Sequence, residues 1–260
     1  MTGPTPLLDF FKRGELARDV RLLAAQGALG LRAHEQLAIL VLLVDDPDPT
    51  IGRTADETLN RIPEGALRAF LARSDVSISL REFFGDRGVF PDEIPSILAI
   101  EDDDHPLIDS PEIDDSADVA GDKGSTLQQL SEMSFTERLK AALKGSREVR
   151  AILIRDTNKM ISAAVLSGPK VTPQEVESFA RMTNVSEDIL RVIGNTRAWV
   201  KNYGVVVALA KNPKTPIAMS LNLMGRLQDR DLTMLSVDRN VPETLRIAAR
   251  RKVLASTSGH

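Results

Sequence analysis

Side chains that commonly bind metals or perform catalysis are few in this sequence and lie far apart. The three histidines are His34, His105 and His260, and no two of them have the spacing of metal ligands. Glu35 follows His34, but no second histidine completes the H-E-x-x-H motif of a zinc protease. The chain has no cysteine, no G-x-S-x-G motif, and no phosphate-binding spacing around Gly168-Pro169-Lys170. We therefore expect no catalytic residue, no cofactor and no metal site.

A run of acidic residues from Glu101 to Gly124 could bind calcium or a basic surface. It holds ten Asp and Glu residues and one base, Lys123. Its Asp102-Asp103-Asp104 triplet lacks the alternating acids and the closing glutamate of an EF-hand loop, which favours a solvated charge run. Without aromatic residues or apolar periodicity, the run buries too little surface to offset the entropy of ordering. We predict a flexible linker. The alternative is that it docks on the basic C-terminal half as a nucleic-acid mimic or an autoinhibitory cover.

Basic and aromatic side chains gather in the second half of the chain. Trp199 and Tyr203 are four residues apart, which predicts that they share one helix face. Basic side chains interleaved with aromatic ones can bind phosphates and stack on nucleobases. The alternative is that both aromatic residues fill the core while the bases are solvated. The candidate partner-binding residues are Arg155, Arg197, Trp199, Lys201, Tyr203, Lys211, Arg239, Arg246, Arg250 and Arg251.

Charge is divided unequally along the chain, although the net charge is only −4. Residues 1–133 carry 12 Lys and Arg against 26 Asp and Glu, a net charge of −14. Residues 134–260 carry 21 against 11, a net charge of +10. Such a division points to association with a charged partner, or to docking of one half on the other.

The elements that must position these residues form a repeat between Asp156 and Leu254. An aspartate or asparagine recurs every 28 residues, and an aliphatic residue follows each one five positions later. The polar residues are Asp156, Asn184, Asn212 and Asn240, and the aliphatic ones are Ile161, Ile189, Ile217 and Leu245. A second register runs through Phe179, Val207 and Leu235, each followed by a small residue. We predict two helices of roughly 10 residues in each unit, with stacked units completing the core.

The repeated polar residues allow two interpretations. Side chains of asparagine in a row could clamp the backbone of an extended peptide. The simpler interpretation is structural, because Asn and Asp tolerate left-handed geometry and cap turns. Three of the four follow a base, namely Arg155, Lys211 and Arg239, and these bases are therefore expected to line one rim of a stack.

Several helix boundaries can be predicted from capping residues and prolines. Ser134 and Thr172 each precede a glutamate by three positions, which is the spacing of a capping box. Asp45 to Pro49 should end an apolar helix that begins near His34, because proline lacks an N–H and disfavours helix in the residue before it. Thr54-Ala-Asp-Glu57 has capping-box spacing, which predicts a helix to about Ile62, and Pro63 should start another.

The composition favours helices packed on helices. Aromatic residues make up 4% of the chain and apolar residues 42%. The longest apolar run, Leu37 to Val44, is far shorter than the about 20 residues that a membrane-spanning helix needs. We expect no membrane partner. No signal peptide is evident at the N-terminus, and the lack of cysteine fits a reducing compartment, so we expect a cytoplasmic protein.

These features resemble the HEAT/armadillo-type α-solenoids and the leucine-rich-variant repeats of bacteria. The resemblance rests on the two-helix units, on the Asp-Pro-Asp-Pro turn at 46–49, and on the asparagine that recurs before a helix started by proline. It implies an all-α solenoid of two-helix repeats of 28 residues. The predicted parts are an acidic N-terminal helical domain (1–100), an acidic linker (101–125), a basic C-terminal repeat domain (126–255) and a tail (256–260).

Proteins of these families bind other macromolecules and share no single activity. We therefore expect a non-catalytic scaffold or adaptor that binds a protein partner through its C-terminal repeat surface. One alternative is a nucleic-acid-binding repeat protein that its acidic linker inhibits. A second alternative is a helical-repeat enzyme, similar to a glycosylase or a lyase.

Overall fold

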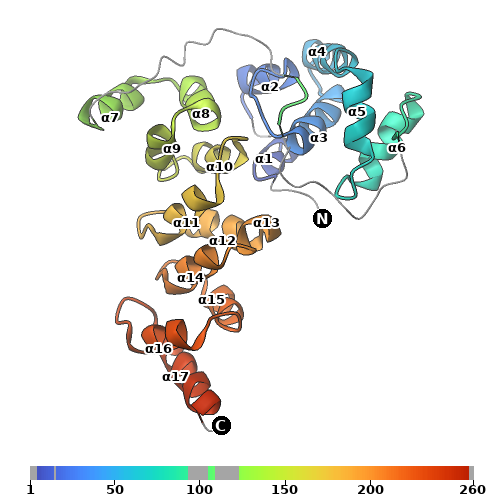
Figure 1. Ribbon diagram of the computed structural model, residues 1–260. Helices are drawn as coiled ribbons and strands as arrows, with labels where there is room; N and C mark the ends of the chain where they lie inside the picture. The colour runs from blue at the N-terminus through green and yellow to red at the C-terminus, as the bar shows by residue number, and fades with distance from the viewer. Residues whose placement is uncertain (1–4, 15, 93–104, 109–122, 258–260) are drawn as a thin grey trace. The chain divides into compact units, whose positions relative to one another are not determined.

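A computed structural model describes residues 5–14, 16–92, 105–108 and 123–257 of the chain (Figure 1). Within these ranges the chain forms 17 α-helices and no β-strand, so the predicted all-α class is confirmed. The chain divides into two compact units, Met1–Lys170 and Val171–His260. This division lies inside the region 126–255. Most of the predicted acidic linker, and residues 258–260 of the predicted tail, lie outside the described residues.

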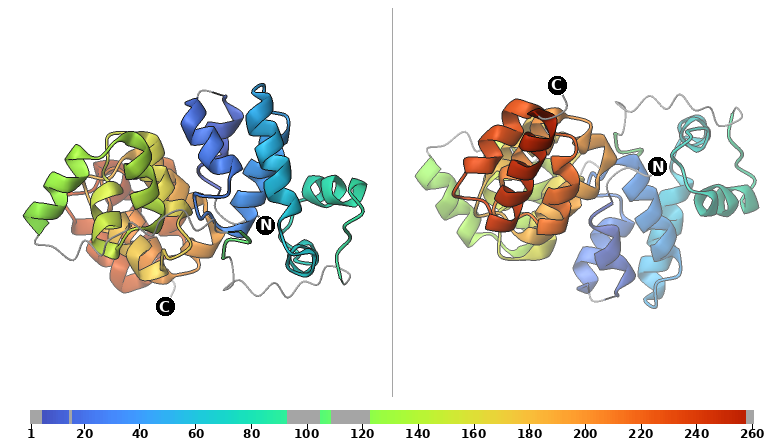
Figure 2. Two further views of the ribbon diagram at one scale, coloured as in Figure 1. Left: turned by 90° about the horizontal axis from the view of Figure 1, so that it is seen from above. Right: turned by 90° about the horizontal axis from the view of Figure 1, so that it is seen from below.

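The first unit contains ten helices among its described residues. They are α1 (Leu8–Lys12), α2 (Arg18–Ala25), α3 (Ala33–Val44), α4 (Pro49–Asn60), α5 (Glu64–Leu71), α6 (Ile78–Asp86), α7 (Lys123–Glu132), α8 (Phe135–Lys144), α9 (Arg147–Leu153) and α10 (Lys159–Ser167). Helices α2, α3 and α4 pack against one another, and α1 and α6 also contact α3 (Figure 2). Helices α8, α9 and α10 pack together in the same way. The most apolar helix, α3, therefore lies at the centre of the first group.

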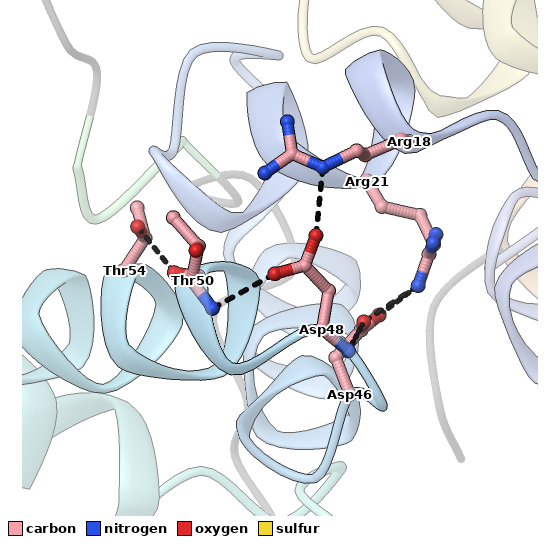
Figure 3. Close-up of polar contacts among 6 residues, drawn as sticks. All are labelled: Arg18, Arg21, Asp46, Asp48, Thr50 and Thr54. Atoms are coloured by element: carbon pink, nitrogen blue, oxygen red, sulfur yellow. Dashed lines mark hydrogen bonds and ion pairs between the residues drawn. The ribbon is translucent and has the colours of Figure 1, made fainter.

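The turn between α3 and α4 is built by two aspartates two positions apart, Asp46 and Asp48 (Figure 3). Asp46 Oδ1 accepts a hydrogen bond from the Asp48 backbone N–H at 2.8 Å, and Asp48 Oδ1 caps α4 by accepting from the Thr50 N–H at 2.9 Å. Two bases of α2 complete the turn. Arg21 Nη1 lies 2.6 Å from both Asp46 carboxylate oxygens, and Arg18 Nε lies 2.7 Å from Asp48 Oδ2. These ion pairs hold α2 against the start of α4.

The start of α4 differs from the sequence prediction. The helix begins at Pro49, with Asp48 as its N-cap, and the predicted start at Thr54 is therefore wrong. Thr54 lies inside the helix, where its hydroxyl donates to the Thr50 carbonyl at 2.8 Å. Asp48 and Pro49 form an earlier helix start that the local sequence favours as much as the one at Thr54. Aspartate is a preferred N-cap residue, and proline is well suited to the first helical position.

The turn between α9 and α10 repeats this construction. Asp156 Oδ1 accepts from the Asn158 N–H at 2.8 Å, and Asn158 Oδ1 caps α10 by accepting from the Met160 N–H at 2.9 Å. Arg138 of α8 pairs with Asp156 at 3.1 Å, as Arg21 of α2 pairs with its aspartate. The two groups of helices in the first unit thus each contain a polar turn of the same construction.

The second unit contains seven helices among its described residues. They are α11 (Pro173–Arg181), α12 (Glu187–Asn195), α13 (Arg197–Val200), α14 (Tyr203–Lys211), α15 (Ile217–Met224), α16 (Asp229–Val237) and α17 (Glu243–Thr257). The first residues of α11 and α12 are 14 positions apart, as are those of α14 and α15 and those of α16 and α17. Within each of these three pairs, the distance between the two helix starts is therefore half of the 28-residue period. The strongest packing joins α16 to α17, α11 to α14 and α14 to α15.

Two of the three predicted capping boxes, and most of the predicted core positions, are present. Ser134 and Thr172 each cap a helix reciprocally with the glutamate three positions later. Among the four aliphatic residues of the repeat, Ile161, Ile189 and Leu245 are buried, whereas Ile217 is 44% exposed at the start of α15. In the second register, Phe179 and Leu235 are buried.

The repeated polar residues support turns, and one of them also joins two turns. Asn212 is buried, and its Nδ2 donates to the carbonyls of Ala180 at 2.7 Å and Met182 at 2.9 Å, near the end of α11. Asn184 is exposed, and α12 is capped instead by Ser186, whose Oγ accepts from the Ile189 N–H. Ser77 caps α6 through the same Val-Ser sequence. Among the described residues, no helix is both long and apolar enough to cross a membrane.

Candidate protein-binding sites

The first candidate site is a buried glutamine that binds the backbone of a distant segment. Gln36 lies in the first turn of α3, and only 3% of it is exposed. Its Oε1 accepts hydrogen bonds from the backbone N–H groups of Leu107 at 2.9 Å and Ile108 at 3.2 Å. Its Nε2 donates to the Ile108 carbonyl. Both ends of the side-chain amide are therefore used on main-chain atoms that lie 71 and 72 residues further along the chain.

The space for this segment is left by a glycine at the end of α2. Gly27 has φ +73°, and a Cβ placed there would lie 3.2 Å from Ile108 Cγ2 and 3.4 Å from Thr58 Cγ2. Any larger residue at Gly27 would therefore press on the Ile108 side chain. We define the Gln36 docking site as Gly27, Gln36 and Thr58, which come from the end of α2, from α3 and from α4. All three are buried, whereas Leu107 and Ile108 are half-buried.

A buried carboxylate lies beside Gln36 in the sequence. Glu35 Oε1 accepts from the backbone N–H groups of Leu7 at 2.6 Å and Leu8 at 3.2 Å, where α1 begins. Complete burial raises the pKa of Glu35 from 4.5 to about 7, and the Ser167 hydroxyl, the two N–H groups and the Arg32 charge only partly oppose this. Arg32 also donates to the Gly168 carbonyl after α10, at 3.2 and 3.4 Å. Glu35 and its neighbours therefore connect α1, α3 and the end of α10.

The predicted pair of aromatic residues is divided between two helices. Trp199 is buried in α13, whereas Tyr203 is the first residue of α14, and the Asn202 side chain caps α14 between them. The expectation that they share one helix face is therefore wrong, because Asn202 starts a new helix. Trp199 belongs to the core of the second unit.

Tyr203 and Lys211 converge on one carboxylate. The Tyr203 hydroxyl donates to Asp231 Oδ2 at 2.7 Å and accepts from the Gln228 N–H at 3.0 Å, while Lys211 Nζ lies 2.9 Å from Asp231 Oδ1. The Tyr203 hydrogen bond is the largest of the causes that hold the pKa of Asp231 below its usual value, and Lys211 adds to it. Burial and Asp231 raise the pKa of the Tyr203 hydroxyl. Two of the candidate binding residues therefore stabilise the contact between α14 and α16.

The remaining candidate residues are spread over both units. Arg155 belongs to the first unit, where its Nε donates to the Ala151 carbonyl in the preceding turn. In the second unit, Arg250 Nε donates to the Ser236 carbonyl of α16 at 3.1 Å, and Arg246 is half-buried. Of these remaining candidate residues, the ones that are exposed on the second unit are Arg197, Lys201, Arg239, Arg250 and Arg251. Within that unit the structure brings the bases of α17 together on one helix.

A second candidate site is the exposed apolar surface of α16 and α17. These helices pack side by side (Figure 2). On α17, Ile247, Arg251 and Leu254 follow the spacing i, i+4, i+7 and so lie on one face, and Leu254 is 66% exposed. On α16, Met234 and Val237 are three residues apart and exposed. We call these five residues the α16–α17 surface.

The sequence contains one signal for the Gln36 docking site. Glu35 and Gln36 stand at the start of an otherwise apolar helix, and buried polar groups require hydrogen-bond partners. The sequence does not reveal the partners themselves, because they are backbone groups far away in the chain.

The described residues contain no group of three or more His, Asp and Glu side chains that could hold a metal ion. Comparison with known proteins gave no match to a family model, a curated protein or a solved structure.

Proposed function

We propose that the chain is a non-catalytic helical-repeat adaptor that binds an acidic protein partner through the α16–α17 surface. The observation that carries the proposal is the exposure of apolar side chains beside Arg251 on that surface. Ile247 and Leu254 flank the exposed Arg251 on one face of α17. Arginine and large apolar residues are enriched at the centres of protein interfaces.

The charge of the second unit favours an acidic partner. Residues 171–260 carry 13 Lys and Arg against 8 Asp and Glu. Complementary charge increases the rate of association and disfavours basic partners. The proposal includes a cytoplasmic location, in keeping with a chain that has no cysteine.

The repeat part of the proposal is supported by hydrogen bonds between residues about one period apart. Tyr203 bonds Asp231, and Lys252 Nζ donates to the Met224 carbonyl, in both cases across 28 residues. Asn212 bonds Ala180 across 32 residues. A stack of two-helix units would place equivalent residues of neighbouring units in contact in this way.

Affinity capture with matched variants tests the proposal. The purified full chain serves as bait in a nuclease-treated extract, beside an Ile247→Ser/Leu254→Ser variant and an Ile78→Ser control. Ile78 is 71% exposed on α6, in the first unit. We expect an acidic protein that the wild type and the control retain and the double variant loses. If the double variant retains every protein that the wild type retains, the α16–α17 surface is not the binding site.

Nucleic acid is the second candidate partner, because Arg239, Arg250 and Arg251 are all exposed on the second unit. Binding to phosphates would weaken steeply as salt rises, since it releases counterions from the nucleic acid. Titration of mixed DNA and RNA with the full chain at low and moderate salt tests this. An Arg250→Gln/Arg251→Gln variant should then bind more weakly with a smaller salt dependence.

A further inference from the structure

We propose that the Gln36 docking site is a binding site for a short, bent apolar protein segment, and that Leu107 and Ile108 occupy it as a displaceable internal ligand. The segment His105–Ile108 is drawn as the short green piece beside α2 in Figure 1. It contacts the first unit through the backbone, in the manner of a bound peptide. The proposal concerns a different unit from the α16–α17 surface and does not depend on it.

The hydrogen-bond pattern defines what the site recognises. Gln36 accepts from two consecutive N–H groups and donates to the carbonyl of the second residue. A segment with proline in place of Leu107 or Ile108 would lack one of these N–H groups. Two consecutive N–H groups converge on one oxygen only where the backbone turns, as it does at Leu107, so the site selects a bent conformation. Side-chain specificity must come from elsewhere.

The side-chain preference comes from Gly27 and Thr58. Ile108 Cγ2 lies close to the position that a Cβ would take on Gly27. The missing side chain at Gly27 leaves room for the branched Cγ2 methyl group of Ile108. The preferred ligand is therefore a bent segment whose second residue is a branched aliphatic one, as Ile108 is.

An empty site would cost free energy, because the buried Gln36 amide would have no hydrogen-bond partner. The internal ligand avoids this cost. A buried amide without partners loses the hydrogen bonds that it would make to water. Only 12 residues, 93–104, separate Asp92 from His105, so the chain itself keeps Leu107 and Ile108 near the site. A tethered ligand acts at a high effective concentration, and an outside peptide must exceed it to compete. The contacts are nevertheless few: three hydrogen bonds and one well-placed side chain.

The test uses the full chain and a labelled synthetic peptide with the sequence of residues 104–110. An emptied chain, Leu107→Pro/Ile108→Pro, lacks both N–H groups that Gln36 binds and should bind the peptide at least about tenfold more tightly than the wild type, because the internal ligand no longer competes. Adding Gln36→Leu to the emptied chain should abolish that binding. A control peptide carrying N-methyl groups on the two amides that correspond to Leu107 and Ile108 keeps both side chains and loses both N–H groups. It should bind at least about tenfold more weakly than the unmodified peptide.

Hydrogen exchange of the wild type provides a second measurement that does not require the emptied chain to fold. The amides of Leu107 and Ile108 should be protected, and a large excess of the peptide should speed their exchange by displacing the segment. The proposal is overturned if the folded emptied chain does not bind the peptide, or if the methylated peptide binds equally well. It is also overturned if excess peptide leaves the exchange of the two amides unchanged, since the segment would then be a fixed part of the fold.

Discussion

Replacing Glu35 by glutamine should remove a pH-dependent loss of stability from the first unit. Burial raises the pKa of Glu35 in the folded chain to about 7, from 4.5 in the unfolded chain. The folded state therefore binds the proton more tightly than the unfolded state. This contribution to stability is complete below the unfolded pKa and is lost as the pH rises through the folded pKa.

The size of the effect follows from the two pKa values. A change from 4.5 to about 7 corresponds to about 3 kcal/mol between the protonated and the ionised carboxyl, at 1.36 kcal/mol for each unit. Glutamine is neutral at every pH, and its oxygen can still accept from the N–H groups of Leu7 and Leu8. The variant should match the wild type at about pH 4 and exceed its stability by up to about 3 kcal/mol at about pH 8.

Urea unfolding at several pH values measures this difference. Far-UV circular dichroism follows the whole chain, and amide exchange at Leu7 and Leu8 reports on the first unit. The only tryptophan, Trp199, lies in the second unit, so its fluorescence is an internal control that Glu35→Gln should leave unchanged. Glu57→Gln makes the same chemical change at an exposed position of α4. Stability curves of wild type and Glu35→Gln that run parallel from about pH 5 to about pH 8 would refute the reasoning.

Two further predictions use pairs of matched positions. Gly27→Ala should destabilise the first unit more than Gly14→Ala and should speed amide exchange at Ile108. Both glycines have left-handed backbone, at φ +73° and +70°, and so share a strain of about 1 kcal/mol, but only at Gly27 would the new methyl group meet Ile108. Equal losses in urea unfolding would contradict this. Asn212→Ala should destabilise the second unit by roughly 2 kcal/mol, because it removes an amide that bonds two carbonyls, whereas Asn184→Ala at the exposed equivalent position should cost less than about 0.5 kcal/mol. The tryptophan fluorescence in urea measures both, and coincident midpoints would show that the buried bonds contribute little.

The parts of the fold that could be predicted are those decided by neighbouring residues. The helix starts at Ser134 and Thr172 follow from capping boxes, in which both partners lie within four positions. The α4 prediction failed because Asp48 and Thr54 both carry cap signals, and only packing chooses between them. The break after Trp199 was missed because the four-residue spacing of Trp199 and Tyr203 also fits a single helix, although Asn202 between them caps a new one.

The candidate sites could be predicted only in part, for a different physical reason. Bases and exposed apolar residues of α17 can be read from the sequence, since helix periodicity places them on one face. The contact between Gln36 and Leu107 joins residues 71 positions apart, and it uses backbone atoms that every residue possesses. No pattern of side chains along the chain records such a contact.

Two adjacent polar residues in α3 nevertheless point to a general signal. Glu35 binds the backbone N–H groups at the start of α1, and Gln36 binds the backbone of Leu107 and Ile108. Both are buried in the most apolar helix of the first unit, where an unpaired polar group would cost free energy. Because successive residues of a helix point about 100° apart, the two side chains reach different segments. A pair of polar residues at the start of an apolar helix therefore indicates two remote backbone segments that the helix holds, and the sequence leaves only the identity of those segments to be found.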